Sequence, residues 1–155
     1  MVHSGLKAEI AKEVPKLQSA HAILLLNGKF ILQLRDNKPH IENPNKWSLF
    51  GGKIEKGEEP AGAIRREIFE ELFIFPPEYR YLWFKDHLTI SANIPARIWF
   101  FVANIEEAWD HHVLNEGSDV GSFSIDEIFY LHMVSVMREA IIRFHESIKT
   151  DQKAK

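Results

Sequence analysis

The sequence predicts an α/β fold in which a mixed β-sheet lies between α-helices. Strand-like segments stand on both sides of an amphipathic helix near residues 60–75, and a second amphipathic helix ends the chain. Helices that must bury one apolar face, with strands before and after them, are typical of layered mixed sheets. The length of 155 residues suffices for one domain with its own core.

The first predicted strands form a hairpin. Residues 20–35, AHAILLLNGKFILQLR, contain two apolar runs around Asn27-Gly28, a strong signal for a two-residue turn. The preceding residues 1–19 are expected to form an N-terminal arm or short helix. After the hairpin, WSLFGGKIE at 47–55 predicts a short strand that is interrupted by the double glycine.

The middle helix is predicted to start at Pro60, because proline suits the first turn of a helix. Pro76 and Pro77 end it. Its apolar residues share one side and are expected to face the core: Ala61, Ile64, Ile68 and Leu72.

Further strands are predicted at about 79–90 and 96–105, with a shorter one near 119–124. The C-terminal helix is predicted to pack on the sheet through residues spaced three and four apart: Val134, Met137, Ile141, Phe144 and Ile148. A single domain is expected over residues 20–150, with 151–155 as a tail.

Composition excludes several classes of protein. The formal net charge is −3, so no broad basic surface for a nucleic-acid polymer is expected. The chain has no cysteine, which excludes disulfides and thiolate-bound metal. It has no apolar run of the roughly 18 residues that a membrane span needs, and no signal-peptide core. We therefore expect a cytoplasmic protein with no membrane partner.

Three carboxylates gather on the middle helix. Glu67, Glu70 and Glu71 lie within about 100° of arc, and like charges at this spacing oppose helix formation. Only Arg66 offers a nearby cation. A solvated surface helix is the simpler explanation of any glutamate-rich segment. The alternative is a bound divalent cation: Mg²⁺ prefers carboxylate oxygens together with substrate phosphates, and Mn²⁺ is expected to substitute for it.

Residues 52–74 resemble the Nudix box of the Nudix hydrolase superfamily. The motif places its fixed residues at set spacings, and here these positions hold Gly52, Glu58, Arg66, Glu67, Ile68, Glu70, Glu71 and Ile74. The one departure is Phe73, where the family usually has glycine. Phenylalanine adopts a left-handed helix-ending turn only at a cost. We therefore expect the helix to run on until just before Pro76, with the register of the carboxylates unchanged.

The resemblance implies roles for the box glutamates. Glu67 and Glu71 are expected to be principal metal ligands. Glu70 is expected to be a further ligand or to bridge a second metal. Each should be needed for activity. The resemblance also implies that the backbone carbonyl of Gly51 contacts metal, since a glycine lets the chain approach closely.

The resemblance also implies supporting and substrate-binding residues. Gly52 opens the box, and Glu58 and Arg66 occupy the positions that brace the loop and orient the catalytic glutamates. A purely structural ion pair is the alternative for those two. Arg35 resembles an arginine that contacts substrate phosphate, a task that suits its fork of donors; a salt bridge at the rim is the alternative.

A loop carboxylate is expected to complete the site. Antimutator-type members of the family use a Glu-Gly pair in a loop beyond the central strands, and Glu116-Gly117 stands at a comparable place. Such a carboxylate can hold another metal or deprotonate the attacking water. An ordinary turn is the alternative explanation of this segment, and Asp119 and Asp126 are the rival carboxylates.

The leading functional hypothesis is a Mg²⁺-dependent pyrophosphohydrolase that cleaves a nucleoside diphosphate linked to another group. Nucleotide sugars, including ADP-ribose, are favoured over canonical or oxidised nucleoside triphosphates. A non-catalytic nucleotide-binding module of the same fold is a second hypothesis. An isomerase of isopentenyl diphosphate is a third, but those enzymes use a cysteine that this chain lacks. The expected partners are a small-molecule nucleotide and, as is common in the family, a second subunit in a homodimer.

Overall fold

The computed structural model describes residues 14–153, and the expected N-terminal arm lies mostly outside this range. The strands are β1 (Leu17–Leu26), β2 (Lys29–Leu34), β3 (Trp47–Ser48), β4 (Phe50–Lys53), β5 (Arg80–Leu88), β6 (Pro95–Asn104) and β7 (Asp119–Phe123). The helices are α2 (Pro60–Leu72), the 3₁₀ turn η1 (Trp109–His111), α3 (Ile125–Ile128) and α4 (Ser135–Lys153).

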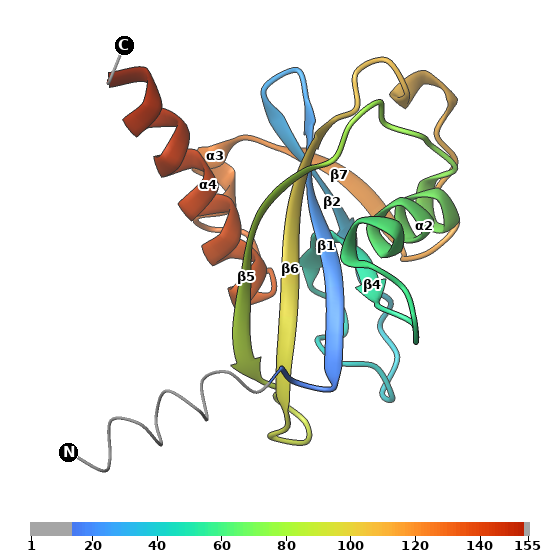
Figure 1. Cartoon of the computed structure of the whole chain (residues 1–155). Coiled ribbons are helices and arrows are strands. Elements are labelled where there is room, and N and C mark those ends of the chain that lie inside the picture. The colour runs from blue at the N-terminus through green and yellow to red at the C-terminus, as the bar shows by residue number, and fades with distance from the viewer. Residues whose placement is uncertain (1–13, 154–155) are drawn as a thin grey trace, which may run out of the picture.

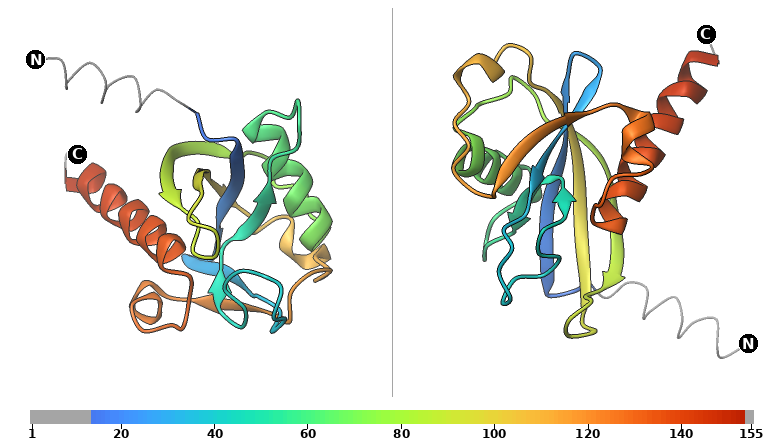
Figure 2. Two further views of the ribbon diagram at one scale, coloured as in Figure 1. Left: turned by 90° about the horizontal axis from the view of Figure 1, so that it is seen from below. Right: turned by 180° about the vertical axis from the view of Figure 1, so that it is seen from behind.

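The seven strands form one mixed sheet. Its main order is β3-β2-β1-β6-β5, with β4 paired to β1 and β7 paired to β2. The pairing of β1 with β6 is parallel, and the other strand pairs are antiparallel. Helix α2 covers one face and α4 lies against the other (Figures 1 and 2). The predicted mixed sheet between helices is confirmed.

The predicted hairpin is present. Leu26 pairs with Lys29 across a two-residue turn in which Asn27 and Gly28 have φ of 52° and 76°, as the tight turns of hairpins require. Strand β1 begins at Leu17, inside the segment expected to be an arm. At the other end of the chain α4 continues to Lys153, into the expected tail.

The break in the WSLFGGKIE segment falls at Leu49 and not at the double glycine. Trp47–Ser48 pairs with β2, whereas Phe50–Lys53 pairs with β1. Leu49 is fully buried at the point where the chain passes from one partner strand to the other. The prediction of a glycine interruption is wrong because the glycines fit within a paired strand, at positions where a side chain would collide with its neighbours.

Alternation along β1 divides the core into two halves. Ala20, Ala22 and Leu24 face α2, and Ile23 faces α4 from the opposite side of the sheet. Most helix residues predicted to face the core are buried on the two sides: Ile64, Ile68 and Leu72 from α2, and Met137, Ile141 and Phe144 from α4. Ala61 and Ile148 pack against the same clusters and are partly buried. Burying one such side chain stabilises the fold by about 1.5–3 kcal/mol, so these rows fix both helices on the sheet.

Helix α2 ends at Leu72, and Phe73 adopts the left-handed conformation that the sequence argument excluded, with φ 55° and ψ 35°. Its N–H donates to the Phe69 carbonyl at 2.8 Å. Ile74 is 2% exposed and packs in the half of the core that lies beneath α2. The chain turns out of the helix at Phe73, and this turn brings Ile74 into the core. The prediction of a longer helix is wrong because this burial outweighs a local cost of about 1–2 kcal/mol.

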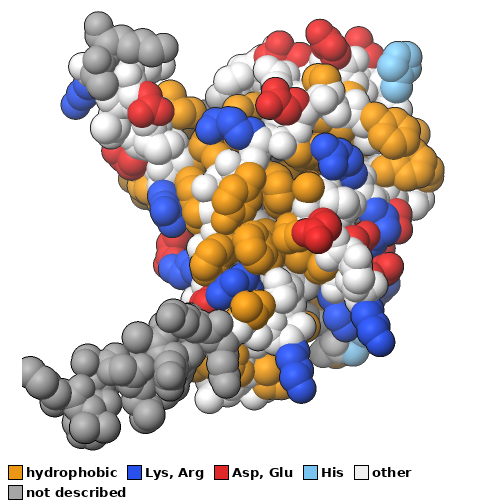
Figure 3. Space-filling view, in the orientation of Figure 1, with side chains coloured by type: hydrophobic (Ala, Val, Ile, Leu, Met, Phe, Trp, Pro, Cys, Tyr) orange, Lys and Arg blue, Asp and Glu red, His pale blue; other side chains and the backbone are white. Residues whose placement is uncertain are grey.

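Strands β5 and β6 expose aromatic side chains beside α2. Phe101 is 3% exposed, but Tyr81 and Phe84 are 47% and 43% exposed. The Arg97 guanidinium lies 3.9 Å from the centre of the Phe84 ring. This apolar area over β5 and β6 lies near the centre of Figure 3. Helix α2 therefore covers only part of its face of the sheet. Within residues 14–153, no helix combines the length and apolar character needed to cross a membrane.

Candidate functional site: a carboxylate cluster beside a cavity

Helix α2 places its three carboxylates at different depths. Glu71 is 1% exposed, Glu67 is half-buried and Glu70 is exposed. Because Ile64, Ile68 and Leu72 hold the helix against the sheet, the neighbouring face that carries these glutamates is turned toward β4. The register expected from the sequence is therefore kept despite the early end of the helix.

Arg66 is the cation at the centre of this cluster. Its Nε and Nη2 donate to the two oxygens of Glu58, both at 2.8 Å, and its Nη1 donates to Glu67 at 2.8 Å and to Glu70 at 3.3 Å. Nη2 also donates to the Lys53 carbonyl at 3.0 Å. The hydrogen bonds from Arg66 hold the pKa of Glu58 at about 2, and those from Glu58 and Glu67 raise the pKa of Arg66. This network ties α2 to the loop before it.

Glu71 differs from its neighbours because its carboxylate lies away from water. Its Oε2 is buried without a hydrogen-bond partner. Burial, with smaller contributions from the negative charges of Glu67 and Glu116, raises the pKa of Glu71 to about 9. Burial also raises the pKa of Glu67. Arg66 therefore offsets the burial of these two carboxyl groups only in part, through its contact with Glu67.

Gly51 and Gly52 allow β4 to pass between β1 and α2. A Cβ added to Gly52 would lie 2.6 Å from the Glu67 carboxylate, and one added to Gly51 would lie 2.1 Å from the Ala20 carbonyl oxygen. Gly51 also has φ of 148°, a conformation that side chains disfavour. Glycine is therefore required for the strand to approach the carboxylates this closely.

The donor set fits a hard divalent cation. Carboxylate oxygens are the ligands that Mg²⁺ and Mn²⁺ prefer, and the orphaned Glu71 oxygen is a buried acceptor with no other partner. Among residues 14–153, no three His, Asp or Glu side chains are already arranged as a metal-binding group. Arg66 instead engages the carboxylates of Glu67 and Glu70.

The loop that carries Glu116 is fastened to the end of α2. The backbone N–H of Asn115 donates to the Glu71 carbonyl at 2.8 Å, its side-chain amide donates to the Glu70 carbonyl at 3.1 Å, and the N–H of Val113 donates to Leu72. The loop thereby satisfies carbonyls that a helix end leaves free. It also brings the Glu116 charge close enough to raise the pKa of Glu71.

The rival carboxylates lie elsewhere. Asp119 begins β7, and its side chain accepts the N–H of Val120 at 2.8 Å. Asp126 lies in the first turn of α3, where an acidic residue suits the positive end of a helix. Neither contributes to the pKa of Glu71. Of the three candidates, Glu116 is the one that the fold brings beside the box.

Arg35 borders two cavities. Its Nε donates to the Glu42 carbonyl at 2.9 Å, which holds the side chain at the end of β2. Arg35 lines both a cavity of about 380 Å³ that reaches Gly51 and Gly52 and a cavity of about 410 Å³ that reaches Glu116.

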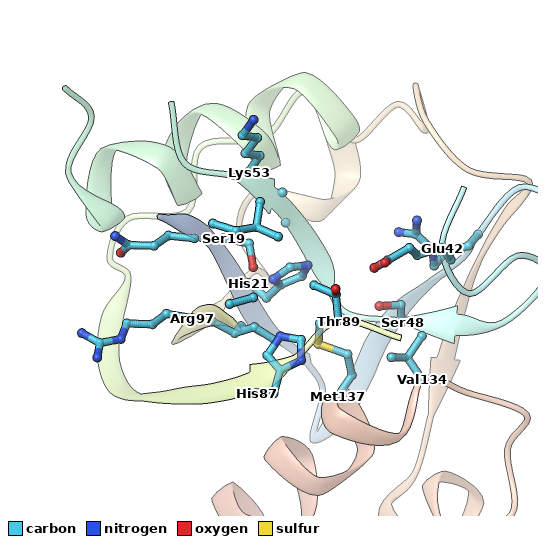
Figure 4. Close-up of a pocket in the computed structure, with 17 residues that line it drawn as sticks. Ser19, His21, Glu42, Ser48, Lys53, His87, Thr89, Arg97, Val134 and Met137 are labelled. Atoms are coloured by element: carbon cyan, nitrogen blue, oxygen red, sulfur yellow. The ribbon is translucent and has the colours of Figure 1, made fainter. Parts of the chain in front are cut away.

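His21 lines the first of these cavities and was missed by the sequence argument. It lies on β1, opposite Gly51 of β4, and Figure 4 shows its ring among the side chains of the cavity. Burial, with smaller contributions from Arg35 and His87, lowers the pKa of His21 to about 3. The sequence did contain a signal for this residue, because His21 is the one polar residue in the apolar run AHAILLL of the predicted strand.

Comparison with known proteins agrees with this geometry. A family model of the NUDIX domain matches residues 16–144. A MutT protein from Methanosarcina mazei Go1 has a TM-score of 0.74 at 21% identity, over 88% of this chain and 98% of that one. A MutT NUDIX hydrolase from Burkholderia pseudomallei has a TM-score of 0.66 at 22% identity, over 80% and 94%. The NUDIX domain of Shewanella oneidensis NrtR, complexed with ADP ribose, has a TM-score of 0.70 at 19% identity, over 92% and 97%.

At identities of 19–22% these structures establish the fold, while the family model spans most of the chain. Nudix enzymes generally use divalent metal ions, and the glutamates of the box are all present here. The chain therefore belongs to the Nudix family and is a hydrolase that acts on a phosphoric anhydride bond.

Proposed function

We propose that the protein is a Mg²⁺-dependent pyrophosphohydrolase of nucleoside diphosphates linked to a second group, with nucleotide sugars as the favoured class. Water adds to one phosphorus of the diphosphate and the bridging P–O bond breaks. The products are a nucleoside monophosphate and the phosphate of the second group. The observation that carries this proposal is the buried Glu71 carboxylate beside Glu67, whose Oε2 has no hydrogen-bond partner, because a cation from outside the chain would satisfy that oxygen.

The ion would be held by Glu67, Glu70 and Glu71 with the Gly51 carbonyl. When bound, Mg²⁺ neutralises the diphosphate, polarises phosphorus and lowers the pKa of water. Glu116, on the loop fastened to α2, would accept the proton of the attacking water.

Two arginines would support this chemistry. Arg66, with its bonds to Glu58 and Glu67, would keep the glutamates in position. Arg35 would bind a phosphate oxygen through its free N–H groups.

The two cavities beside Arg35 favour a substrate with a bulky group at each end of its phosphates. A nucleotide sugar has a nucleoside on one side of the diphosphate and a sugar on the other, and Arg35 lines two cavities, of about 380 and 410 Å³. A nucleoside triphosphate has one such end. The NrtR domain that shares this fold is complexed with ADP ribose, a ligand of the favoured form.

A substrate panel tests the proposal. Nucleotide sugars, dinucleotides and canonical or oxidised triphosphates are incubated with the protein and Mg²⁺ in ¹⁸O-labelled water, and the products are identified by mass. We expect a nucleoside monophosphate and a sugar phosphate, with the label in one of the two products marking the attacked phosphorus. Glu67→Gln should be inactive, and Glu107→Gln, at an exposed site, should behave as wild type.

Two results would contradict the proposal. Release of pyrophosphate from triphosphates alone would assign the protein to the triphosphate diphosphatases. Binding of a nucleotide with no turnover of any compound in the panel would make it a non-catalytic nucleotide-binding module.

A further inference from the structure

The cavity that contains His21, called here the His21 cavity, presents several polar side chains to its interior. Ser19, Ser48, His87 and Thr89 line it with His21 (Figure 4). The Arg97 side chain points away from them in the same view and is bound to Asp86 at 2.7 and 3.0 Å. The Lys53 side chain also points away from His21, and Glu42 lies at the far end of the lining beside Ser48 (Figure 4). The interior around His21 therefore suits a hydrogen-bonding part of a ligand.

One part of the wall of the His21 cavity is apolar. It is formed by Ala96 and Ile98 of β6, by Val134 just before α4 and by Met137 in the first turn of α4. Methionine is an adaptable side chain that makes favourable contacts with aromatic rings. A nucleobase has two flat apolar faces and a polar edge, whereas a sugar carries hydroxyl groups on all sides. Apolar walls with polar groups between them match the base.

His21 supplies the hydrogen-bonding group that lacks a partner in the protein. Its Nδ1 is buried with no hydrogen bond, and a buried polar atom left in this state is costly. A neutral imidazole offers one donor and one acceptor. Rotation of the ring by about 180° exchanges Nδ1 with Cδ2, and ring orientation follows the hydrogen bonds on offer. A ligand in the cavity can therefore satisfy the ring without any movement of β1.

His21 is also coupled by position to the carboxylate site. It pairs with Gly51 across β1 and β4, and a Cβ on Gly51 would lie 2.8 Å from His21 Cγ. The next residue, Gly52, lies against the Glu67 carboxylate. One short stretch of β4 thus separates the cavity from the place where the diphosphate would be cleaved. A base bound at His21 leaves its 5′-phosphate to be bound near Gly51 and Gly52.

We propose that His21 is a specificity-determining residue that hydrogen-bonds the edge of the substrate's nucleobase in the His21 cavity. This inference rests on the proposed function, because it assigns the nucleoside half of that substrate to one of the two cavities. The sugar half is then bound in the cavity that Glu116 borders.

The test measures binding without turnover. Isothermal titration in EDTA compares the four nucleoside monophosphates with ribose 5-phosphate, which lacks the base. For the tightest nucleotide, His21→Leu should weaken binding by about tenfold, the scale of one hydrogen bond, with ribose 5-phosphate unaffected. His21→Asn, which keeps a donor and an acceptor, should recover part of the affinity. His111→Leu, at an exposed histidine, is the matched control.

Two outcomes would overturn the inference: a nucleotide affinity of His21→Leu within about twofold of wild type, or an equal loss for ribose 5-phosphate. A second measurement uses only the wild-type protein, so the inference can be tested even if His21→Leu folds poorly. The ¹⁵N shifts of the His21 ring should move when the nucleotide is added to wild type and stay fixed with ribose 5-phosphate. Unmoved shifts with both would also overturn it. Because this binding test is made without metal, it does not depend on hydrolysis, and a failure of the substrate panel with Mg²⁺ would count against the proposed function alone.

Discussion

The backbone N–H of Asn115 donates to the carbonyl oxygen of Glu71 at 2.8 Å. A loop far along the chain is thereby bound to the residue of the box that is most deeply buried. The Asn115 side chain adds a second bond, to the Glu70 carbonyl at 3.1 Å. Glu116 follows directly, so its position relative to the carboxylate cluster is set by these two bonds and not by a free loop.

Glu116→Gln is expected to lower kcat by about a hundredfold or more, because a lost general base costs on the order of 10²–10⁴ in rate. Asp119→Asn is the matched control, since Asp119 is engaged with the N–H of Val120 and should leave activity near wild type. Both are assayed at saturating Mg²⁺ on the compound that the panel identifies. If Glu116→Gln keeps most of its activity, the proton is accepted elsewhere.

Glu71→Gln is expected to weaken Mg²⁺ and Mn²⁺ binding by at least about tenfold. Even residues that only support metal ligands cost about 10–100-fold in affinity when changed, and Glu71 offers a buried oxygen without another partner. Isothermal titration of metal-free protein measures the effect, with Glu107→Gln as the exposed control. An unchanged affinity in Glu71→Gln would remove this residue from the metal site.

The same carboxyl group predicts how the stability of the metal-free protein depends on pH. The pKa of Glu71 rises from 4.5 to about 9 on folding, chiefly through burial. At pH values between 4.5 and about 9, the folded state therefore keeps a proton on Glu71 that the unfolded state has released. The stability that this proton contributes is fully present below the unfolded pKa and is lost as the pH rises toward the folded pKa. From pH 6 to 8 the free energy of unfolding should fall, by at most about 1.4 kcal/mol per pH unit from this group.

Urea unfolding in EDTA at pH 6, 7 and 8 measures this slope. Glu71→Gln, an uncharged mimic of the protonated acid, should show a shallower fall than wild type. Parallel slopes for the two proteins would mean that Glu71 is ionised in the folded state without metal.

Local patterns were enough to predict the hairpin and the carboxylate face. Asn27-Gly28 specifies its turn through backbone conformation alone, and the spacing of Glu67, Glu70 and Glu71 places them on one side of any helix. These features depend on neighbours within a few residues. The roles expected of these glutamates came from the family resemblance of residues 52–74.

The His21 cavity and the docked loop could not be predicted in the same way. Both depend on contacts between distant segments: the pairing of His21 with Gly51 and the bonds from Asn115 to α2. Periodicity carries no information about which loop meets which helix end. The error at Leu49 has the same origin, because a change of partner strand leaves no signal in a short run of residues.

Phe73 provides the test of how α2 ends. Phe73→Gly and Phe73→Ala both remove the edge contact with Phe69, whose ring centre lies 5.4 Å away. Only glycine relieves the left-handed backbone at φ 55°. The glycine variant should therefore exceed the alanine variant by about 1 kcal/mol in free energy of unfolding, with Phe73→Asn between them. Urea denaturation of the three variants measures the order. An alanine variant as stable as the glycine variant would indicate that the helix continues through Phe73, as local propensity alone predicts.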